Sequence, residues 1–446
     1  MNRIMQNIRA MSMVKAGDVV GVAVSGGRDS MALLHYLNEV KEDLDIEIVS
    51  INIDHCIRAQ SENDSRFVAE YCKENKIRNY KFTIDSLKIA RERKMSIEQA
   101  AREGRYEAFR SLIKKGIVDK IALAHHLNDQ AETILMHILR GSGLHGASGM
   151  GYISEKGFIR PMRDVPRGKI DEYIQENDIM YVEDETNADS SYMRNFVRNE
   201  VLPVIAKRWP SAVETISNFG NICKQDDDYI NSLVDFDAVW IDKAKGLVRM
   251  PRNYFIYPVS VVSRMIKKAF EALDIFADNE YKHINMIIDL ANKSENGSKI
   301  SLPNKVTVYN EYDYVTIEHK KPKVSKAKWA FGMGKKKIDG VGELIVRKSK
   351  TKDKEEGKLK IDAGKLPKGI VWRFREDGDT IVKFGGFNKK VKSLLNEKKV
   401  PSRLRDNLPM LAIGSEVFVV AGVEISDKLK IDETTKAVVE IEFKFI

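Results

Sequence analysis

The sequence predicts an α/β protein that begins with an open, doubly wound parallel sheet and continues through a helical middle region into a small α+β carboxyl-terminal region. Three observations carry this prediction: strand and helix patterns alternate over the first ~140 residues, helical periodicity dominates the middle, and short β-like runs follow it. A length of 446 residues corresponds to about three domains at the usual ~100–200 residues each. We expect them at residues 1–210, 211–320 and 321–446.

Four buried strands are expected in the first region, because apolar or alternating runs occur at Val19–Ser25, Ile46–Asp54, Asn79–Ile84 and Lys120–His125. Each is followed by a stretch with helical spacing: Asp29–Val40, Glu62–Glu74, Ile97–Lys115 and Asn128–Arg140. Strands that alternate with helices form parallel sheets through right-handed crossovers. Ligands of such sheets bind at the carboxyl ends of the strands, so we expect the functional residues there.

The rest of the chain has weaker patterns. It is irregular through Tyr192, helical from Arg198 to about Ala291, and β-like at 299–301, 305–309 and 314–318. Residues 320–360 are rich in lysine and form either a linker or the twisted edge of a small sheet. The runs IVWRF, DTIVKF and EVFVVAGVEI beyond them indicate a small α+β module.

The positive charge is concentrated in the carboxyl-terminal part. The chain has 74 Lys or Arg against 65 Asp or Glu, a net +9. Residues 320–360 hold 15 basic against 5 acidic residues, and 320–446 carry a net +13, which leaves −4 for residues 1–319. A basic appendage on a nearly neutral body predicts a polyanionic partner, although a solvated, Lys-rich linker has the same composition.

Composition excludes several classes of protein. A hydrophobic content of 43% excludes a mainly disordered chain. No apolar stretch reaches the ~18 residues of a membrane span, and the first residues contain no signal-peptide pattern, so we expect a cytoplasmic protein. The three cysteines, Cys56, Cys72 and Cys223, form no CxxC pair, which argues against a disulfide framework or a Cys-rich zinc site.

The most informative segment is the loop after the first strand, Ser25-Gly26-Gly27-Arg28-Asp29-Ser30. Two glycines allow close approach to an anion, two hydroxyls can donate, and a helix amino terminus follows, so the loop is a phosphate cradle. It matches neither GxxxxGK[ST] nor GxGxxG. Helix capping by Asp29 is the structural alternative, but the strand–loop–helix context favours a nucleotide site.

This loop resembles the SGGxDS motif of the PP-loop ATP-pyrophosphatase superfamily. The resemblance implies that ATP is cleaved to AMP and pyrophosphate, that the loop residues Ser25 to Ser30 bind ATP, and that Asp29 lies on the Mg²⁺ side. A Mg²⁺ ion fits, because it binds a few carboxylates together with phosphate oxygens.

Further segments resemble the tRNA(Ile)-lysidine synthetase family of this superfamily. They are AHHLNDQAETILMHILRGSGLHGASGM (124–150), IDHCIRAQSENDS (53–65), EQAAREGRYEAF (98–109), IRPMRDVPRGKIDEYI, VEDETNADSSYMRNFVRNEVLPVI (182–205), RFREDGD (373–379), NKKVKSLLNEKKVP (388–401) and RDNLP (405–409). The resemblance spans roughly 18–210 and 371–425. It implies ATP-dependent ligation of L-lysine to C2 of the wobble cytidine, position 34, of the CAU-anticodon tRNA(Ile), through an adenylated cytidine, which gives lysidine, AMP and pyrophosphate.

The residues expected to be catalytic are Asp29, Arg105, His125, Asp129 and Glu132. Asp129 and Glu132 lie three apart on one helical face, where a carboxylate pair can bind the lysine ammonium and help to remove its proton. The alternative is that Asp129 caps its helix and Glu132 is solvated. Arg105 can stabilise charge on phosphate, or it can form an exposed salt bridge. Of the crowded histidines 125, 126, 137 and 145, one is expected in the active site and three are structural or on the surface.

The residues expected to contact tRNA are Arg194, Arg198, Arg373, Arg375, Lys389, Lys390 and Lys392. Asn128 and Cys56 depart from the family pattern, which usually has Asp and Gly at these positions. Two rival functions are a tRNA thiolation enzyme of the same superfamily, which needs reactive cysteines, and a non-catalytic tRNA-binding protein. The sequence leaves the oligomeric state open, a homodimer included.

Overall fold

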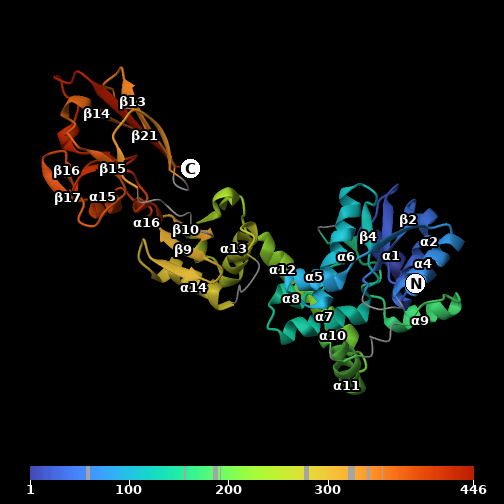
Figure 1. The fold of residues 1–446 in the computed structure, drawn as a ribbon. Coiled ribbons are helices and arrows are strands. Elements are labelled where there is room, and N and C mark those ends of the chain that lie inside the picture. Colours follow the sequence, from blue (N-terminus) through green and yellow to red (C-terminus); the bar gives the residue numbers. More distant parts are fainter. Residues whose placement is uncertain are drawn as a thin grey trace. The chain divides into compact units, whose positions relative to one another are not determined.

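The computed structural model describes the whole chain except residues 57–60, 155–156, 184–188, 191, 276–280, 320–326, 339–341, 354 and 446. Parts of the motif segments 53–65 and 182–205 and of the basic stretch 320–360 lie outside the described residues. The chain divides into two compact units, Met1–Tyr229 and Ile230–Ile446 (Figure 1). The expected division into three domains stays a prediction.

The first unit alternates strands and helices. Its strands are β1 (Val19–Val24), β2 (Glu47–Asp54), β3 (Arg78–Thr83), β4 (Lys120–Ala122) and β5 (Phe158–Ile159). Its helices are α1 (Asn2–Ala10), α2 (Arg28–Glu39), α3 (Lys41–Leu44), α4 (Ser61–Glu74), α5 (Ser86–Arg93), α6 (Ile97–Lys114), α7 (Leu127–Leu139), α8 (Leu144–Ala147), α9 (Arg167–Glu176), α10 (Met193–Phe196), the π-helix η2 (Val197–Val201), α11 (Leu202–Arg208) and α12 (Ala212–Ser232), which continues past Tyr229.

The five strands of this unit form one parallel sheet in the order β3-β2-β1-β4-β5. The alternation along β1 sends Val20, Val22 and Val24 into a core shared with α1, α2, α4 and α9. On the opposite face, Phe109 and Leu112 of α6 pack with Val49 and Ile51 of β2. The sheet is therefore doubly wound, as predicted. The strand order reverses between β1 and β4, which is where such folds bind ligands.

The second unit is richer in strands than the sequence suggests. Its helices are η3 (Lys243–Lys245), η4 (Arg252–Ile256), α13 (Val259–Ala272), α14 (Tyr281–Lys293), η5 (Ala363–Lys365), α15 (Val391–Glu397), α16 (Ser402–Arg405) and η6 (Asp427–Leu429). Its strands are β6 (Trp240–Asp242), β7 (Leu247–Pro251), β8 (Lys299–Leu302), β9 (Val306–Glu311), β10 (Tyr314–His319), β11 (Trp329–Ala330), β12 (Gly334–Ile338), β13 (Gly342–Ser349), β14 (Lys358–Asp362), β15 (Val371–Arg373), β16 (Thr380–Lys383), β17 (Phe387–Lys390), β18 (Met410–Ile413), β19 (Glu416–Val420), β20 (Glu424–Ile425) and β21 (Val438–Phe445).

The middle region contains the expected helices α12, α13 and α14 together with a five-stranded antiparallel sheet, β6-β7-β10-β9-β8. The β-like runs found in the sequence are β8, β9 and β10. Strands β6 and β7 were not expected, because they are short and interrupt a stretch with helical spacing. The terminal part has a seven-stranded and a four-stranded sheet. The described part of the basic stretch 320–360 supplies β11 to β13 and the start of β14, so it belongs to these sheets and is not a linker.

No helix among the described residues is both long enough and apolar enough to cross a membrane. Cys72 and Cys223 are buried and Cys56 is exposed, and all three are free thiols.

Candidate active site

The loop after β1 places hydrogen-bond donors at the carboxyl edge of the sheet. Gly26 has a φ of +88°, a left-handed conformation that glycine adopts at no steric cost. Gly27 is the N-cap of α2, and Ser30 Oγ donates to its carbonyl at 2.8 Å. Ser25 Oγ accepts from the Gly27 N–H at 3.3 Å. These bonds hold a tight turn at the positive end of a helix, which is the arrangement that binds phosphate.

The first two residues of α2 have different neighbours. Arg28 Nη1 donates to Asp171 Oδ1 at 2.8 Å, and its guanidinium lies 5.1 Å from the centre of the Tyr181 ring. Asp29 does not cap its helix, since Gly27 is the N-cap. Among the described residues Asp29 Oδ1 has no hydrogen-bond partner, and Oδ2 lies 3.6 Å from His126 Nε2. Asp29 therefore keeps one carboxylate oxygen for a ligand.

The unpartnered Oδ1 of Asp29 is the atom on which the fit of a Mg²⁺ ion depends. In the part of the chain that the structure describes, no group of three His, Cys, Asp or Glu residues can hold a metal ion alone. Mg²⁺ needs fewer protein ligands, because one or two carboxylates suffice when phosphate oxygens and water complete its shell. Asp29 beside a phosphate-binding loop fits an ion that arrives with the nucleotide.

Helix α7 begins with a capping box. His126 is the N-cap, and its Nδ1 accepts from the Asn128 N–H at 3.2 Å. Asp129 Oδ2 accepts from the His126 N–H at 3.0 Å. The capping role considered for Asp129 is therefore present, and the same residue also lines the cavity described below.

Two arginines pair with the carboxylates of α7. Arg194 donates to Asp129 Oδ1 and Glu132 Oε2, both at 2.9 Å. Arg198 donates to Asp129 Oδ1 and Glu132 Oε1, both at 2.7 Å. Burial acts to raise the pKa of Asp129, but its interactions with His126 and Arg194 lower it to about 2. Both carboxylates are thus held by guanidinium groups, and the Asp129 carboxylate is ionised at neutral pH.

A π-helical turn orients one of these arginines. Helices α10 and α11 are continuous through η2, where the Leu202 N–H donates to the carbonyl of Val197, five residues back. Pro203 follows at once; it lacks an N–H, and its ring clashes with the carbonyl four residues back in an α-helix. The wider turn relieves that conflict, and Arg198 lies within it.

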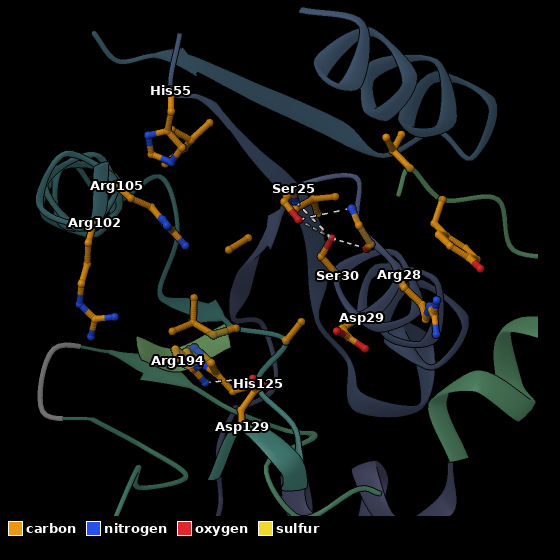
Figure 2. Close-up of a pocket in the computed structure, with 18 of the residues that line it drawn as sticks. Ser25, Arg28, Asp29, Ser30, His55, Arg102, Arg105, His125, Asp129 and Arg194 are labelled. Carbon is orange, nitrogen blue, oxygen red and sulfur yellow. Dashed lines mark hydrogen bonds and ion pairs between the residues drawn. The ribbon is translucent and has the colours of Figure 1, made fainter. Parts of the chain in front are cut away.

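Residues of the loop after β1 and of α2, α6, α7, α10 and η2 line one cavity of about 880 Å³. Figure 2 shows Ser25, Arg28, Asp29 and Ser30 on one side and Arg102 and Arg105 of α6 on the other. Six arginines line it, namely Arg28, Arg102, Arg105, Arg167, Arg194 and Arg198, against three acidic residues, Asp29, Asp129 and Glu183. The excess of positive charge suits a polyphosphate or an RNA backbone.

Two histidines of the cavity are neutral at physiological pH. Burial, with smaller contributions from nearby arginines, lowers the pKa of His125 to about 3, and its Nδ1 has no hydrogen-bond partner among the described residues. Burial and the charge of Arg105 lower the pKa of His55 to about 4. Each can therefore hydrogen-bond a ligand without adding charge.

The structure brings most of the expected residues together. Ser25, Gly27, Arg28, Asp29, Ser30, Arg105, His125, Asp129, Arg194 and Arg198 all line the cavity. Glu132 is 1% exposed and does not line it, because its oxygens are bonded to the two arginines. Gly26 is also absent from the lining and acts through the turn. The alternative of a solvated Glu132 is excluded.

Sequence analysis missed two histidines of this site. His55 lines the cavity, and His126 contacts both Asp29 and Asp129. A signal for His126 existed, since a polar residue before a helix with an acidic residue three positions later is a capping-box pattern.

The carboxyl-terminal residues separate into buried and exposed groups. Arg373 is 2% exposed and forms two hydrogen bonds to Asp379, with others to the carbonyls of Phe374 and Gly414. This corrects its expected role as a tRNA contact, because a buried guanidinium whose two terminal nitrogens are bonded inside the protein cannot reach a phosphate. Arg375 pairs with the exposed Asp406. Lys389 pairs with Glu397, and Lys392 is exposed, as is Lys390.

Family models and known proteins match this chain over most of its length. A family model described as the PP-loop domain matches residues 1–205, and one described as the TilS substrate C-terminal domain matches residues 370–441. The tRNA(Ile)-lysidine synthase of Clostridium acetobutylicum is 32% identical, over 99% of both chains. That of Clostridium perfringens is 34% identical, over 99% of this chain and 98% of the relative. The chain belongs to the tRNA(Ile)-lysidine synthase family.

Membership in the tRNA(Ile)-lysidine synthase family confirms the resemblance, the fold class and the expectation of a carbon–nitrogen ligase. The PP-loop family uses ATP. Among solved structures, a U34-tRNA thiolase from Methanococcus maripaludis is 16% identical with a TM-score of 0.42, over 50% of this chain and 78% of that chain. A TILS C-terminal domain is 17% identical with a TM-score of 0.25, over 27% of this chain and 97% of that chain.

Proposed function

We propose that this protein joins L-lysine to C2 of the wobble cytidine of the CAU-anticodon tRNA(Ile). In the first step the C2 oxygen of cytidine attacks the α-phosphorus of ATP, and the bond to pyrophosphate breaks. In the second, the lysine ε-amine attacks C2, the C2–O bond breaks, AMP leaves with that oxygen, and the nitrogen loses a proton. The observation that carries this proposal is one arginine-rich cavity that joins the SGGRDS loop to Asp129, in a chain that matches lysidine synthases end to end.

The residues take their roles from their positions in the cavity. The turn formed by residues 25–30 holds the β- and γ-phosphates at the start of α2, where the helix presents its amino-terminal N–H groups, and the hydroxyls of Ser25 and Ser30 hold the turn together. Arg105, across the cavity from this loop, stabilises charge on the adenylated cytidine (Figure 2). Asp29 would hold Mg²⁺ together with phosphate oxygens, and the ion would supply charge neutralisation on the phosphates. His125, being neutral, hydrogen-bonds a substrate through Nδ1 without adding charge to the site.

The lysine ammonium binds against Asp129 in this proposal. Of the expected carboxylate pair, only Asp129 lines the cavity, while Glu132 lies behind it and holds Arg194 and Arg198 in place. Asp129→Asn should therefore raise the KM for lysine more than Glu132→Gln does, relative to the effect of each on kcat. Equal KM effects would place the ammonium elsewhere.

The carboxyl-terminal unit is proposed to hold the body of the tRNA, with Arg375, Lys389, Lys390 and Lys392 as phosphate contacts. Lys389 and Lys390 are in β17 and Lys392 is in α15, while Arg375 follows β15. A location in the cytoplasm and a homodimer also stay predictions.

Purified protein, unmodified tRNA transcript, ATP and labelled lysine test the function. We expect lysine on the RNA, and one pyrophosphate and one AMP for each lysidine formed. A transcript with an unmodified GAU anticodon is the control that should remain unlabelled. Incorporation of sulfur with a sulfide donor would support a thiolation enzyme, and tRNA binding without pyrophosphate release would support a non-catalytic protein. Either result would refute the proposal.

A further inference from the structure

We infer that His126 is a positioning residue that ties the phosphate-binding loop to the lysine-side carboxylate through its Nε2–H group. This inference deepens the proposed function and rests on it. His126 does not line the cavity and is 1% exposed, so it touches no substrate. Its Nε2 lies 3.6 Å from Asp29 Oδ2 and 3.5 Å from Asp129 Oδ2.

The position of the ring proton follows from the helix cap. His126 Nδ1 accepts a hydrogen bond from the Asn128 N–H, so Nδ1 must present a lone pair. A neutral imidazole with a bare Nδ1 carries its proton on Nε2. That N–H group therefore points toward the two carboxylates, although both distances exceed those of a full hydrogen bond.

A charged imidazole is the alternative. Burial acts to lower the pKa of His126, but Asp29 and Asp129 raise it above its ordinary value overall. A proton on Nδ1 would, however, face the Asn128 N–H at 3.2 Å and break the cap at the start of α7. The Asn128 N–H bond favours the form with a bare Nδ1, and in either charge state Nε2 carries the proton that faces the two carboxylates, so the contact does not depend on how His126 titrates.

The function of this contact follows from the strand order. Asp29 follows β1 and Asp129 follows β4, and these strands are neighbours at the point where the sheet order reverses. Two carboxylates that converge on one buried point repel each other unless a donor lies between them. Removal of the Nε2–H group should displace Asp29, the second residue of α2, and disturb the phosphate loop before lysine takes part.

Two substitutions separate this role from simple helix capping. Asparagine keeps an oxygen at the Nδ1 position and is a good N-cap, but it has no group that reaches the carboxylates. Glutamine is long enough to place an amide N–H where Nε2–H lies, and it loses the acceptor at the Nδ1 position. If His126 only caps α7, His126→Asn should be active and His126→Gln should be impaired. The positioning role predicts the reverse order.

The expected result is a 10- to 100-fold lower kcat for tRNA-dependent pyrophosphate release in His126→Asn, in line with the usual cost of losing a second-layer partner. His126→Gln should stay within about threefold of the unsubstituted protein on the same scale. The KM for lysine and the affinity for tRNA should change little in both. Equal activities, or a more active asparagine variant, would overturn the inference.

A measurement on the unsubstituted protein keeps the inference testable if either variant fails to fold. Nitrogen-15 NMR of histidine-labelled protein distinguishes the two neutral tautomers from the charged ring, and the His126 signal is the one that is lost in whichever of the two variants folds. We expect a proton on Nε2 at pH 7. A proton on Nδ1 alone would overturn the inference. This readout needs no turnover, so it is independent of whether the protein makes lysidine.

Discussion

Comparing Arg373 with Arg375 tests whether a buried ion pair stabilises the second unit more than a surface ion pair does. The two arginines are two positions apart in one motif and differ in burial. The Arg373 guanidinium donates to Asp379 at 2.6 and 2.8 Å, and the side chains are 3% and 1% exposed. Arg375 pairs with Asp406, whose side chain is 71% exposed. Arg373→Leu leaves a buried carboxylate without its cation, which costs about 3–5 kcal/mol of unfolding free energy. Arg375→Ala loses a surface pair, which costs about 0–1 kcal/mol.

Urea denaturation measures this difference. Trp372 is 1% exposed and stacks on Trp329, with ring centres 6.5 Å apart, so its fluorescence reports unfolding of the second unit. With an m-value of about 3 kcal/mol per molar urea, the midpoint of Arg373→Leu should fall by about 1–1.7 M and that of Arg375→Ala by no more than about 0.3 M. Equal shifts in the two variants would refute the reasoning.

The remaining predictions concern the site and the tRNA surface. Asp29→Asn should reduce pyrophosphate release at least 100-fold while the tRNA dissociation constant stays within about twofold; equal loss of both would remove Asp29 from the nucleotide step. The folded-state pKa of Asp129 is about 2, below its ordinary value of 3.8. The ionised carboxylate therefore stabilises the folded state at pH values above 3.8, and this stabilisation is lost as the pH falls toward 2. Asp129→Asn should therefore cost about 2 kcal/mol at pH 7 and progressively less below pH 4 in acid titrations of stability; a cost independent of pH would contradict this. Lys390→Gln should lower the slope of log affinity for tRNA against log salt by about 1, whereas Arg373→Leu, measured where it is folded, should leave the slope unchanged. Cys56 has a φ of +52°, so Cys56→Gly should stabilise the first unit by up to about 1 kcal/mol in thermal unfolding; a destabilised glycine variant would show that the thiol makes a contact of its own.

The sequence predicts the first unit well because its signals are local. The apolar run of β1, the two glycines and the helical spacing after Asp29 lie within a few residues of each other, and they place the nucleotide loop without tertiary information. Helix spacing likewise places Asp129 and Glu132 on one face of α7. The residues that bond to them come from α10 and η2, more than sixty positions away, and their pairing depends on how the helices pack.

Other features could not be inferred for the same reason. Arg373 looks like a phosphate contact in a basic segment, and only the fold shows Asp379 bonded to it inside the core. Strands β6 and β7 have three and five residues, too few for a periodic pattern to outweigh the helical spacing around them. Position 56 could be interpreted only in part from the sequence. Its departure from a usual glycine is visible in the sequence, but the left-handed backbone that explains the glycine is visible only in the structure.

The widened turn before Pro203 also affects how this chain can vary. A π-turn adds one residue to a helix, and each residue of an α-helix rotates the face by about 100°. If substitution of Pro203 let the segment rewind as a regular α-helix, Arg194 and Arg198 would still share a face, because they are four residues apart. That face would, however, rotate by about 100° relative to Leu202, which packs with Ala131 of α7 in one core cluster. The direction of both guanidinium groups toward α7 therefore depends on a proline that contacts neither substrate nor carboxylate. A scan of cavity residues alone would overlook it.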